Sequence, residues 1–259
     1  MNNLIQITLA TVLVLSMAKS LNIAIFVSIL MPVLIILDYT INKIPNHRLL
    51  SWIKGFSIFI PLVIFTCFTY INKIIKIPAL IFSFILAINI LEPPLIVQFF
   101  NEEPLSIING LLTVILALYT PILSLDKSSG LIGYNNHWLW TIANTTILGS
   151  FYLFHDFLNN GSVKKWLLFS LILPTAFCLI AGSTKLWFAL RVYSLALALF
   201  LVRRYEVITQ KSDEYLFEFT KNKYDWLRLI SIVINTVITI LMINQGNKNT
   251  IIGYLLNKV

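Results

Sequence analysis

The chain has 259 residues, of which 58% are hydrophobic and only 12% charged. A soluble domain usually carries about 25% charged residues, so this composition excludes an ordinary soluble globular protein. The formal net charge of +8 is best explained by Lys and Arg at helix ends, where they meet anionic lipid headgroups, and no nucleic-acid partner is expected. The sequence predicts an all-α, polytopic transmembrane helix bundle.

Nine apolar segments are long enough to be membrane spans, and we expect them to form one transmembrane domain over residues 1–259. Eight spans is the alternative, if the first or the eighth segment does not cross fully. The tail, residues 244–259, is expected to lie on the membrane surface as a short amphipathic helix. The expected spans are 4–18, 23–41, 56–71, 77–100, 107–125, 138–158, 166–181, 186–202 and 227–243.

The connections between spans predict an orientation. Lys and Arg are more frequent in the connections on the side of the N-terminus, which places the N-terminus in the cytoplasm. The longest connection, residues 203–226, has an apolar side among its charges and is expected to be an amphipathic cytoplasmic segment. Abundant Ile, Asn and Lys are typical of AT-rich bacterial genomes, so the predicted location is a bacterial cytoplasmic membrane.

The fourth segment is interrupted by Glu92, Pro93 and Pro94. Proline removes a backbone donor, and a charge near mid-bilayer costs roughly 2.5–3.5 kcal/mol on insertion scales. Such a break is tolerated only where protein or water takes up the freed groups, so we expect Glu92 in the bundle interior, at the centre of a site. Glu92 is either a proton or cation carrier, or a structural carboxyl that is ion-paired or protonated.

Arg191 lies about one and a half turns into the eighth segment. A guanidinium suits an anion or carboxylate anchor, although snorkelling to the interface or pairing with Glu92 would also explain it. Four asparagines in apolar segments are expected to be buried amides: Asn89, Asn109, Asn144 and Asn235. The first three would orient a ligand near Glu92. Asparagine also commonly bonds across helices for structural reasons alone, which is the default interpretation of Asn235.

His155 and Asp156 lie near the end of the sixth segment. Adjacent helical residues point about 100° apart, so they form an interface cluster more readily than a catalytic pair. No H-E-x-x-H or C-x-x-C motif is present, and we expect neither a metal site nor a cofactor. The tryptophans near span ends predict an aromatic belt at the two membrane interfaces: Trp138, Trp140, Trp166, Trp187 and Trp226.

Three short motifs carry a family resemblance: Asn89-Ile90-Leu91-Glu92, Asn109-Gly110-Leu111-Leu112 and the run 187–193. Together they resemble a bacterial multi-spanning membrane protein family of unknown function. Pro93 and Pro94 depart from that family's pattern. The resemblance implies no activity, but it favours Glu92, Asn109 and Arg191 as parts of one site.

The leading functional hypothesis is binding or transport of a small molecule or ion through an interior polar pocket. The second is a membrane-embedded enzyme acting on a lipid or isoprenoid, with His155 and Asp156 as acid and base. The third is an accessory or assembly protein without its own chemistry. The sequence leaves the ligand, the enzymatic or non-enzymatic nature and the oligomeric state open.

Overall fold

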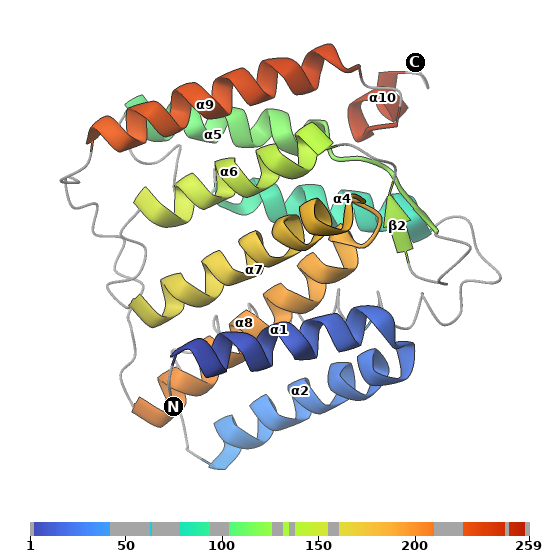
Figure 1. The fold of residues 1–259 in the computed structure, drawn as a ribbon, viewed down its shortest axis with the longest axis vertical. Helices are drawn as coiled ribbons and strands as arrows, with labels where there is room; N and C mark the ends of the chain where they lie inside the picture. The colour runs from blue at the N-terminus through green and yellow to red at the C-terminus, as the bar shows by residue number, and fades with distance from the viewer. Residues whose placement is uncertain are drawn as a thin grey trace.

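In the computed structural model of the chain, the described residues form mainly α-helices (Figure 1). Within the described part every element is an α-helix except one short β-hairpin, which confirms the all-α class. The predicted third span, 56–71, lies outside the described residues apart from Val63. The structure describes residues 3–41, 63, 78–93, 104–125, 132–134, 138–154, 161–209, 225–246 and 249–256.

The axes of the longer described helices are roughly aligned across the molecule, although the chain direction differs from helix to helix (Figure 1). Helix α6 packs against α9 and α5 on one side and against α7 on the other, while α8 joins α7 to α1 and α2. The elements are α1 (Asn3–Lys19), α2 (Leu21–Ile41), α4 (Pro78–Pro93), α5 (Pro104–Leu118), β1 (Leu123–Leu125), β2 (Ile132–Tyr134), α6 (Trp138–Phe154), α7 (Gly161–Ala181), α8 (Trp187–Thr209), α9 (Asp225–Asn244) and α10 (Ile251–Leu256).

Three helix ends differ by five residues or more from the ends of the predicted spans. Helix α5 ends at Leu118 instead of continuing to residue 125, because Pro121 follows and residues 123–125 form β1, which pairs antiparallel with β2. Helix α7 begins at Gly161, five residues before the predicted start. Helix α8 continues to Thr209, so the first seven residues of the predicted connection 203–226 are helical.

The turn between α7 and α8 is set by Gly182, whose φ is 62°. Its backbone N–H donates to the carbonyl of Leu179, and the N–H of Ser183 donates to Cys178 at 3.1 Å. This is the hydrogen-bond pattern of a glycine-terminated helix end, which an L side chain adopts only with strain. The chain reverses there, so α7 and α8 pack antiparallel along their lengths.

The C-terminal helix α10 is fixed to the end of α5. The N–H of Ile251 donates to the carbonyl of Thr120 at 3.0 Å, and the N–H of Ile122 donates to Asn249 at 2.8 Å. Ile251 and Gly253 are buried, whereas the helix end is exposed. The expected surface helix is therefore anchored to protein through its first turn.

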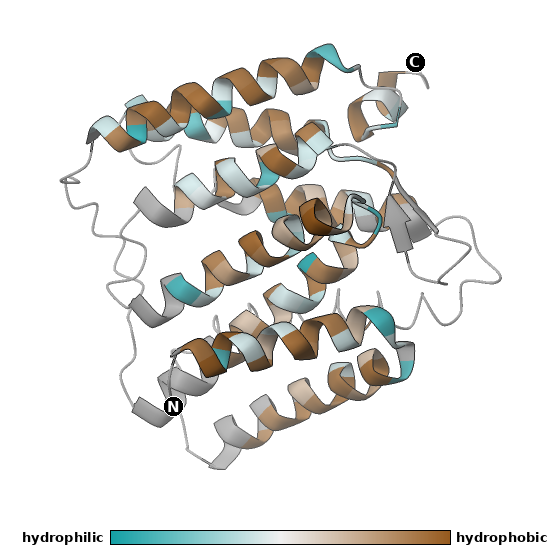
Figure 2. Ribbon diagram, in the orientation of Figure 1, coloured by the Kyte–Doolittle hydropathy of each residue, from teal (hydrophilic) through white to brown (hydrophobic). Residues whose placement is uncertain are grey.

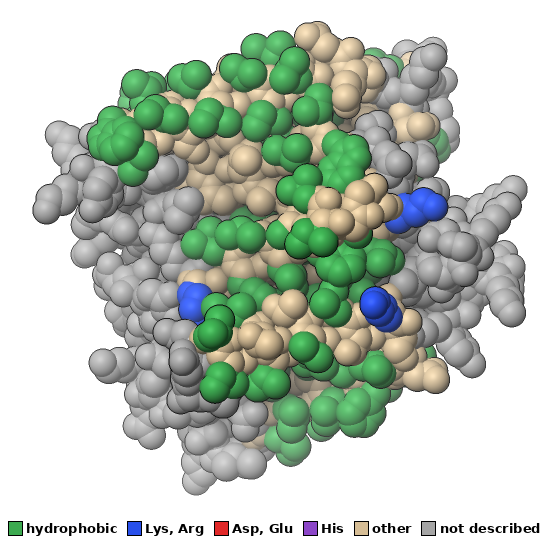
Figure 3. Space-filling model, in the orientation of Figure 1, with side chains coloured by type: hydrophobic (Ala, Val, Ile, Leu, Met, Phe, Trp, Pro, Cys, Tyr) green, Lys and Arg blue, Asp and Glu red, His purple; other side chains and the backbone are tan. Residues whose placement is uncertain are grey.

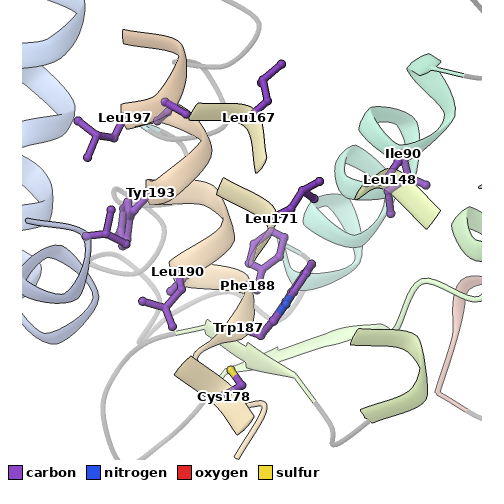
Figure 4. Close-up of a cluster of buried hydrophobic side chains, with 14 of the residues drawn as sticks. Ile90, Leu148, Leu167, Leu171, Cys178, Trp187, Phe188, Leu190, Tyr193 and Leu197 are labelled. Carbon is purple, nitrogen blue, oxygen red and sulfur yellow. The ribbon is translucent and has the colours of Figure 1, made fainter. Parts of the chain in front are cut away.

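The buried core is apolar and is centred on α7 and α8 (Figure 4). The outer surface is also apolar: large aliphatic side chains are exposed along α1, α2 and α9 (Figures 2 and 3). Among the described residues, one helix, Trp226–Asn244, is long and apolar enough by length and composition to cross a membrane. The count of nine spans stays a prediction.

Candidate functional site

The predicted site residues that the structure describes lie on four helices: α4, α5, α6 and α8. Glu92 lies within α4, directly before Pro93, so the helix continues through the carboxylate position. Asn89 is exposed, and its amide nitrogen donates to the carbonyl of Ile85 in its own helix at 3.0 Å. The prediction of a buried amide is therefore wrong for Asn89, because the inward face of α4 carries Ala87 and Ile90 instead. His155 and Asp156 lie outside the described residues.

Arg191 is buried between α7 and α8, with 7% of its surface exposed, so it does not snorkel to an interface. Its Nη1 donates to the hydroxyl of Ser170 at 2.8 Å and to the backbone carbonyl of Ser170 at 3.1 Å. The hydroxyl of Ser194 donates to the same carbonyl at 3.0 Å. Arg191 thus joins two helices, and its proposed pairing with Glu92 stays a prediction.

Two tryptophans assigned to the aromatic belt are instead fully buried. Trp140 donates through Nε1 to the carbonyl of Leu116 at 3.0 Å, and Trp187 donates to the hydroxyl of Thr175 at 3.0 Å. The two indoles meet edge to face, with 5.2 Å between ring centroids. The hydroxyl of Thr145 bonds to that of Thr175 at 2.5 Å. These side chains therefore connect α5, α6, α7 and α8.

Trp166 is also buried, packed edge to face on Phe169 with 5.6 Å between ring centroids. Trp226 is 61% exposed, as the belt interpretation expects. Position near a span end does not distinguish these cases, since buried and interfacial indoles both occur there.

A second set of buried polar side chains lies where α5, α6 and α9 pack against one another. The amide nitrogen of Asn235 donates to the hydroxyl of Ser150 at 3.1 Å, and the hydroxyls of Ser150 and Ser231 are hydrogen-bonded to each other. These bonds connect α9 to α6. We refer to six side chains in this region as the polar layer: Asn109, Asn144, Ser150, Ser231, Asn235 and Thr239.

Several buried atoms of the polar layer have no hydrogen-bond partner within the described part of the chain. They are Oδ1 of Asn109, both polar atoms of the Asn144 amide, Oδ1 of Asn235 and Oγ1 of Thr239. All four residues are less than 5% exposed. Leaving a buried donor or acceptor unpaired costs about 1–3 kcal/mol, so this concentration of such atoms calls for an explanation.

The depth of Asn109 follows from the packing of α5 on α6. Trp140, in the first turn of α6, bonds to Leu116, near the end of α5, so the two helices are antiparallel. Asn109 lies seven residues before Leu116, which places it level with Ile147. At about 1.5 Å per residue, Asn109 is within one turn of the depth of Asn144.

The depth of the α9 residues follows in the same way. Ser150, near the end of α6, bonds to Ser231 in the second turn of α9 and to Asn235 at its middle, and the two helices run in opposite chain directions (Figure 1). Thr239 lies eight residues after Ser231, and Asn144 lies six residues before Ser150. Thr239 and Asn144 are thus nearly level. The groups with unpaired atoms therefore lie within about two helical turns of one another in depth.

Sequence reasoning finds part of this layer. Asn109, Asn144 and Asn235 are predicted as buried amides, and all three are buried. Ser150, Ser231 and Thr239 are missed. The signal that could have found two of them is the spacing on α9, where Ser231, Asn235 and Thr239 recur every fourth residue in an otherwise apolar segment.

The electrostatics of the layer are simple. Every member of the layer is uncharged, and Arg228, which is buried, lies two turns before Asn235 on the inward face of α9. No cluster of His, Cys, Asp or Glu suited to a metal ion occurs among the described residues. The layer can therefore exchange hydrogen bonds, but its own side chains supply no charge and no general base that could activate their hydroxyls as nucleophiles.

Comparisons of this chain with known protein families, curated proteins and solved structures find nothing that matches. The resemblance to a bacterial membrane family, carried by three short motifs, stays a prediction. Function is therefore inferred from the geometry of the chain alone.

Proposed function

We propose that the chain is a multi-pass integral membrane protein that binds a small molecule in its interior, at the polar layer between α5, α6 and α9. The membrane part of this proposal also keeps the predicted cytoplasmic N-terminus. The binding part moves the centre of the site from the predicted Glu92 and Arg191 to the layer around Asn144 and Asn235.

The observation that carries the proposal is the reversed polarity of α9. Its inward face bears Arg228, Asn235 and Thr239, each less than 7% exposed. In water a helix buries its apolar face and exposes its polar one, whereas in lipid the apolar face is outside. Ten large apolar side chains cover its outward face, each 36–61% exposed: Trp226, Leu227, Leu229, Ile230, Val233, Ile234, Val237, Ile240, Leu241 and Ile243.

The positions of the lysines support the same environment. Lys165 lies in the second turn of α7, and Lys185 follows the end of that helix by four residues. In Figure 3, basic side chains (Lys or Arg) lie at opposite edges of an apolar surface. Helix α7 has 21 residues, close to the roughly 20 that a hydrocarbon core of about 30 Å requires. Lysines at both edges of such a band reach the headgroups.

The unpaired atoms of the polar layer support a ligand. A protein that served only as a scaffold gains nothing from buried amides without partners, and intramembrane Asn normally bonds across helices. Arg191, by contrast, is satisfied by Ser170 and acts in the packing of α7 on α8. For a lipid-directed enzyme, the expected acid and base lie outside the described residues, and no observation favours it.

The membrane proposal is tested by spin labels on α9, in a chain whose two cysteines are replaced by alanine. We expect a label at Val237→Cys, on the outward face, to collide with oxygen more than with a water-soluble nickel chelate. A label at Gln245→Cys, exposed just beyond the helix, is the matched control and should show the opposite preference. Equal access of the chelate to both labels, or release of the chain by alkaline carbonate, overturns the proposal.

A further inference from the structure

We infer that the polar layer takes a small uncharged ligand that both donates and accepts hydrogen bonds, of the amide or polyol class, in preference to an inorganic ion. The inference rests on the proposed function, because it concerns the ligand of that same site. It deepens that function by naming the class of ligand.

The inventory of unpaired atoms defines what the ligand must offer. Oδ1 of Asn109 and Oδ1 of Asn235 need donors, because an amide oxygen only accepts. The nitrogen of Asn235 is already used by Ser150. Asn144 has both an unpaired N–H₂ donor and an unpaired oxygen, and the hydroxyl of Thr239 can do either. The layer therefore matches a molecule that carries donors and acceptors together.

A cation is disfavoured at this depth. No carboxylate lies among the described buried residues of α5, α6 and α9, so a bound cation would lack a compensating charge. Neutral oxygens of the layer would have to replace the ion's hydration shell without an opposite charge beside them, and the unpaired amide nitrogen of Asn144 would face the ion as a donor.

An anion is disfavoured for a different reason. The unpaired donors of the layer are the amide nitrogen of Asn144 and the hydroxyl of Thr239, whereas the unpaired oxygens of Asn109 and Asn235 point partial negative charge at the site. An anion would meet more acceptors than donors. An uncharged ligand satisfies both kinds of atom without burying a charge.

Asn144 provides the sharpest test, because its whole amide is unpaired. Replacing it by leucine, which has nearly the same size, removes an unsatisfied donor and acceptor from the ligand-free protein. Asn144→Leu should therefore raise the thermal midpoint of the ligand-free protein and remove the response to ligand. Asn89→Leu is the matched control, because Asn89 is exposed and its amide bonds within α4.

The experiment follows thermal unfolding of the detergent-purified full chain by tryptophan fluorescence, with acetamide, glycerol or sodium chloride added. We expect acetamide or glycerol to raise the midpoint saturably in the native protein and in Asn89→Leu. In Asn144→Leu the apparent affinity should fall at least tenfold. Sodium chloride should give no shift that depends on Asn144. If Asn144→Leu does not fold, Thr239→Val is examined with the same expectations.

Two outcomes overturn the inference. If neither acetamide nor glycerol gives a shift that depends on Asn144, the layer holds only buried water. If sodium chloride gives such a shift, the layer is an ion site. Both results leave the proposed membrane location intact, since that proposal fails separately, by carbonate release of the chain or by equal access of the chelate to the two labels on α9.

Discussion

Arg191 on α8 donates two hydrogen bonds from one guanidinium nitrogen to a single residue of α7, the hydroxyl of Ser170 at 2.8 Å and its backbone carbonyl at 3.1 Å. Two oxygens of Ser170 thus accept from one nitrogen of this charged side chain, and the carbonyl also accepts from Ser194. A lysine side chain is one atom shorter, so its ammonium would not place a donor at the same point. This pair fixes α8 against α7 and gives the first prediction.

We expect Arg191→Lys to lower the free energy of unfolding by about 1–3 kcal/mol, because a buried charge loses part of its hydrogen bonding. Ser170→Ala should cost about 1 kcal/mol, since the backbone carbonyl remains as an acceptor. Thermal unfolding in detergent measures both. Neither variant should alter the shift of the thermal midpoint caused by acetamide or glycerol. Loss of that shift in Arg191→Lys would indicate that Arg191 belongs to the binding site.

The second prediction concerns Trp187 and Thr175, which are joined by a hydrogen bond of 3.0 Å. Trp187→Phe and Thr175→Val each remove one partner, and their combination forms a double-mutant cycle. We expect a coupling energy of about 0.5–1.5 kcal/mol, the usual range for a buried neutral hydrogen bond. A coupling near zero would show that the bond is not formed in solution.

The helical class could be predicted because the long apolar runs of this chain contain few residues that break a helix. Helix α7 ends at Ala181, as predicted. The end of α5 could not be found from apolarity, because Ile122, Leu123 and Leu125 continue the apolar run beyond it. That end depends on contacts with a segment far along the chain, in which Pro121 pairs with Thr250.

The candidate site could be predicted only in part, because burial depends on which face of a helix packs inward. Asn144 and Asn89 both lie in apolar segments, yet Asn144 is buried and Asn89 is exposed. The hydrogen-bond partners of serine and threonine hydroxyls are harder to predict than the burial of asparagine. A serine or threonine in an apolar helix usually bonds to its own helix, as Thr113 does to the carbonyl of Asn109 at 2.7 Å. The sequence does not reveal that Ser150 finds a partner on α9.

The third prediction tests the outward face of α9. Ile234→Lys places a charge on an exposed apolar position near the middle of the helix. We expect it to reduce membrane insertion by about 2.5–3.5 kcal/mol on insertion scales, measured as the inserted fraction in a translocation assay. Gln245→Lys, also exposed but beyond the helix end, should insert normally. Equal insertion of the two variants would argue against lipid contact on this face.

The fourth prediction concerns two glycines whose replacement by alanine should have opposite effects. Gly149 lies inside α6, and a Cβ added there meets no atom within 4 Å. Alanine at this position lowers the entropy of the unfolded chain without a clash, so Gly149→Ala should raise the free energy of unfolding by about 0.5–1 kcal/mol.

Gly182 also has open space where a Cβ would lie, but its φ of 62° is strained for any L side chain. Gly182→Ala should therefore lower the free energy of unfolding by about 1–2 kcal/mol, although nothing is displaced. Thermal unfolding of the two variants separates conformational strain from packing, because free space is common to both positions. If Gly182→Ala is as stable as Gly149→Ala, the chain does not turn from α7 into α8 through a left-handed glycine, and the antiparallel packing that buries Arg191 must be reached by another turn.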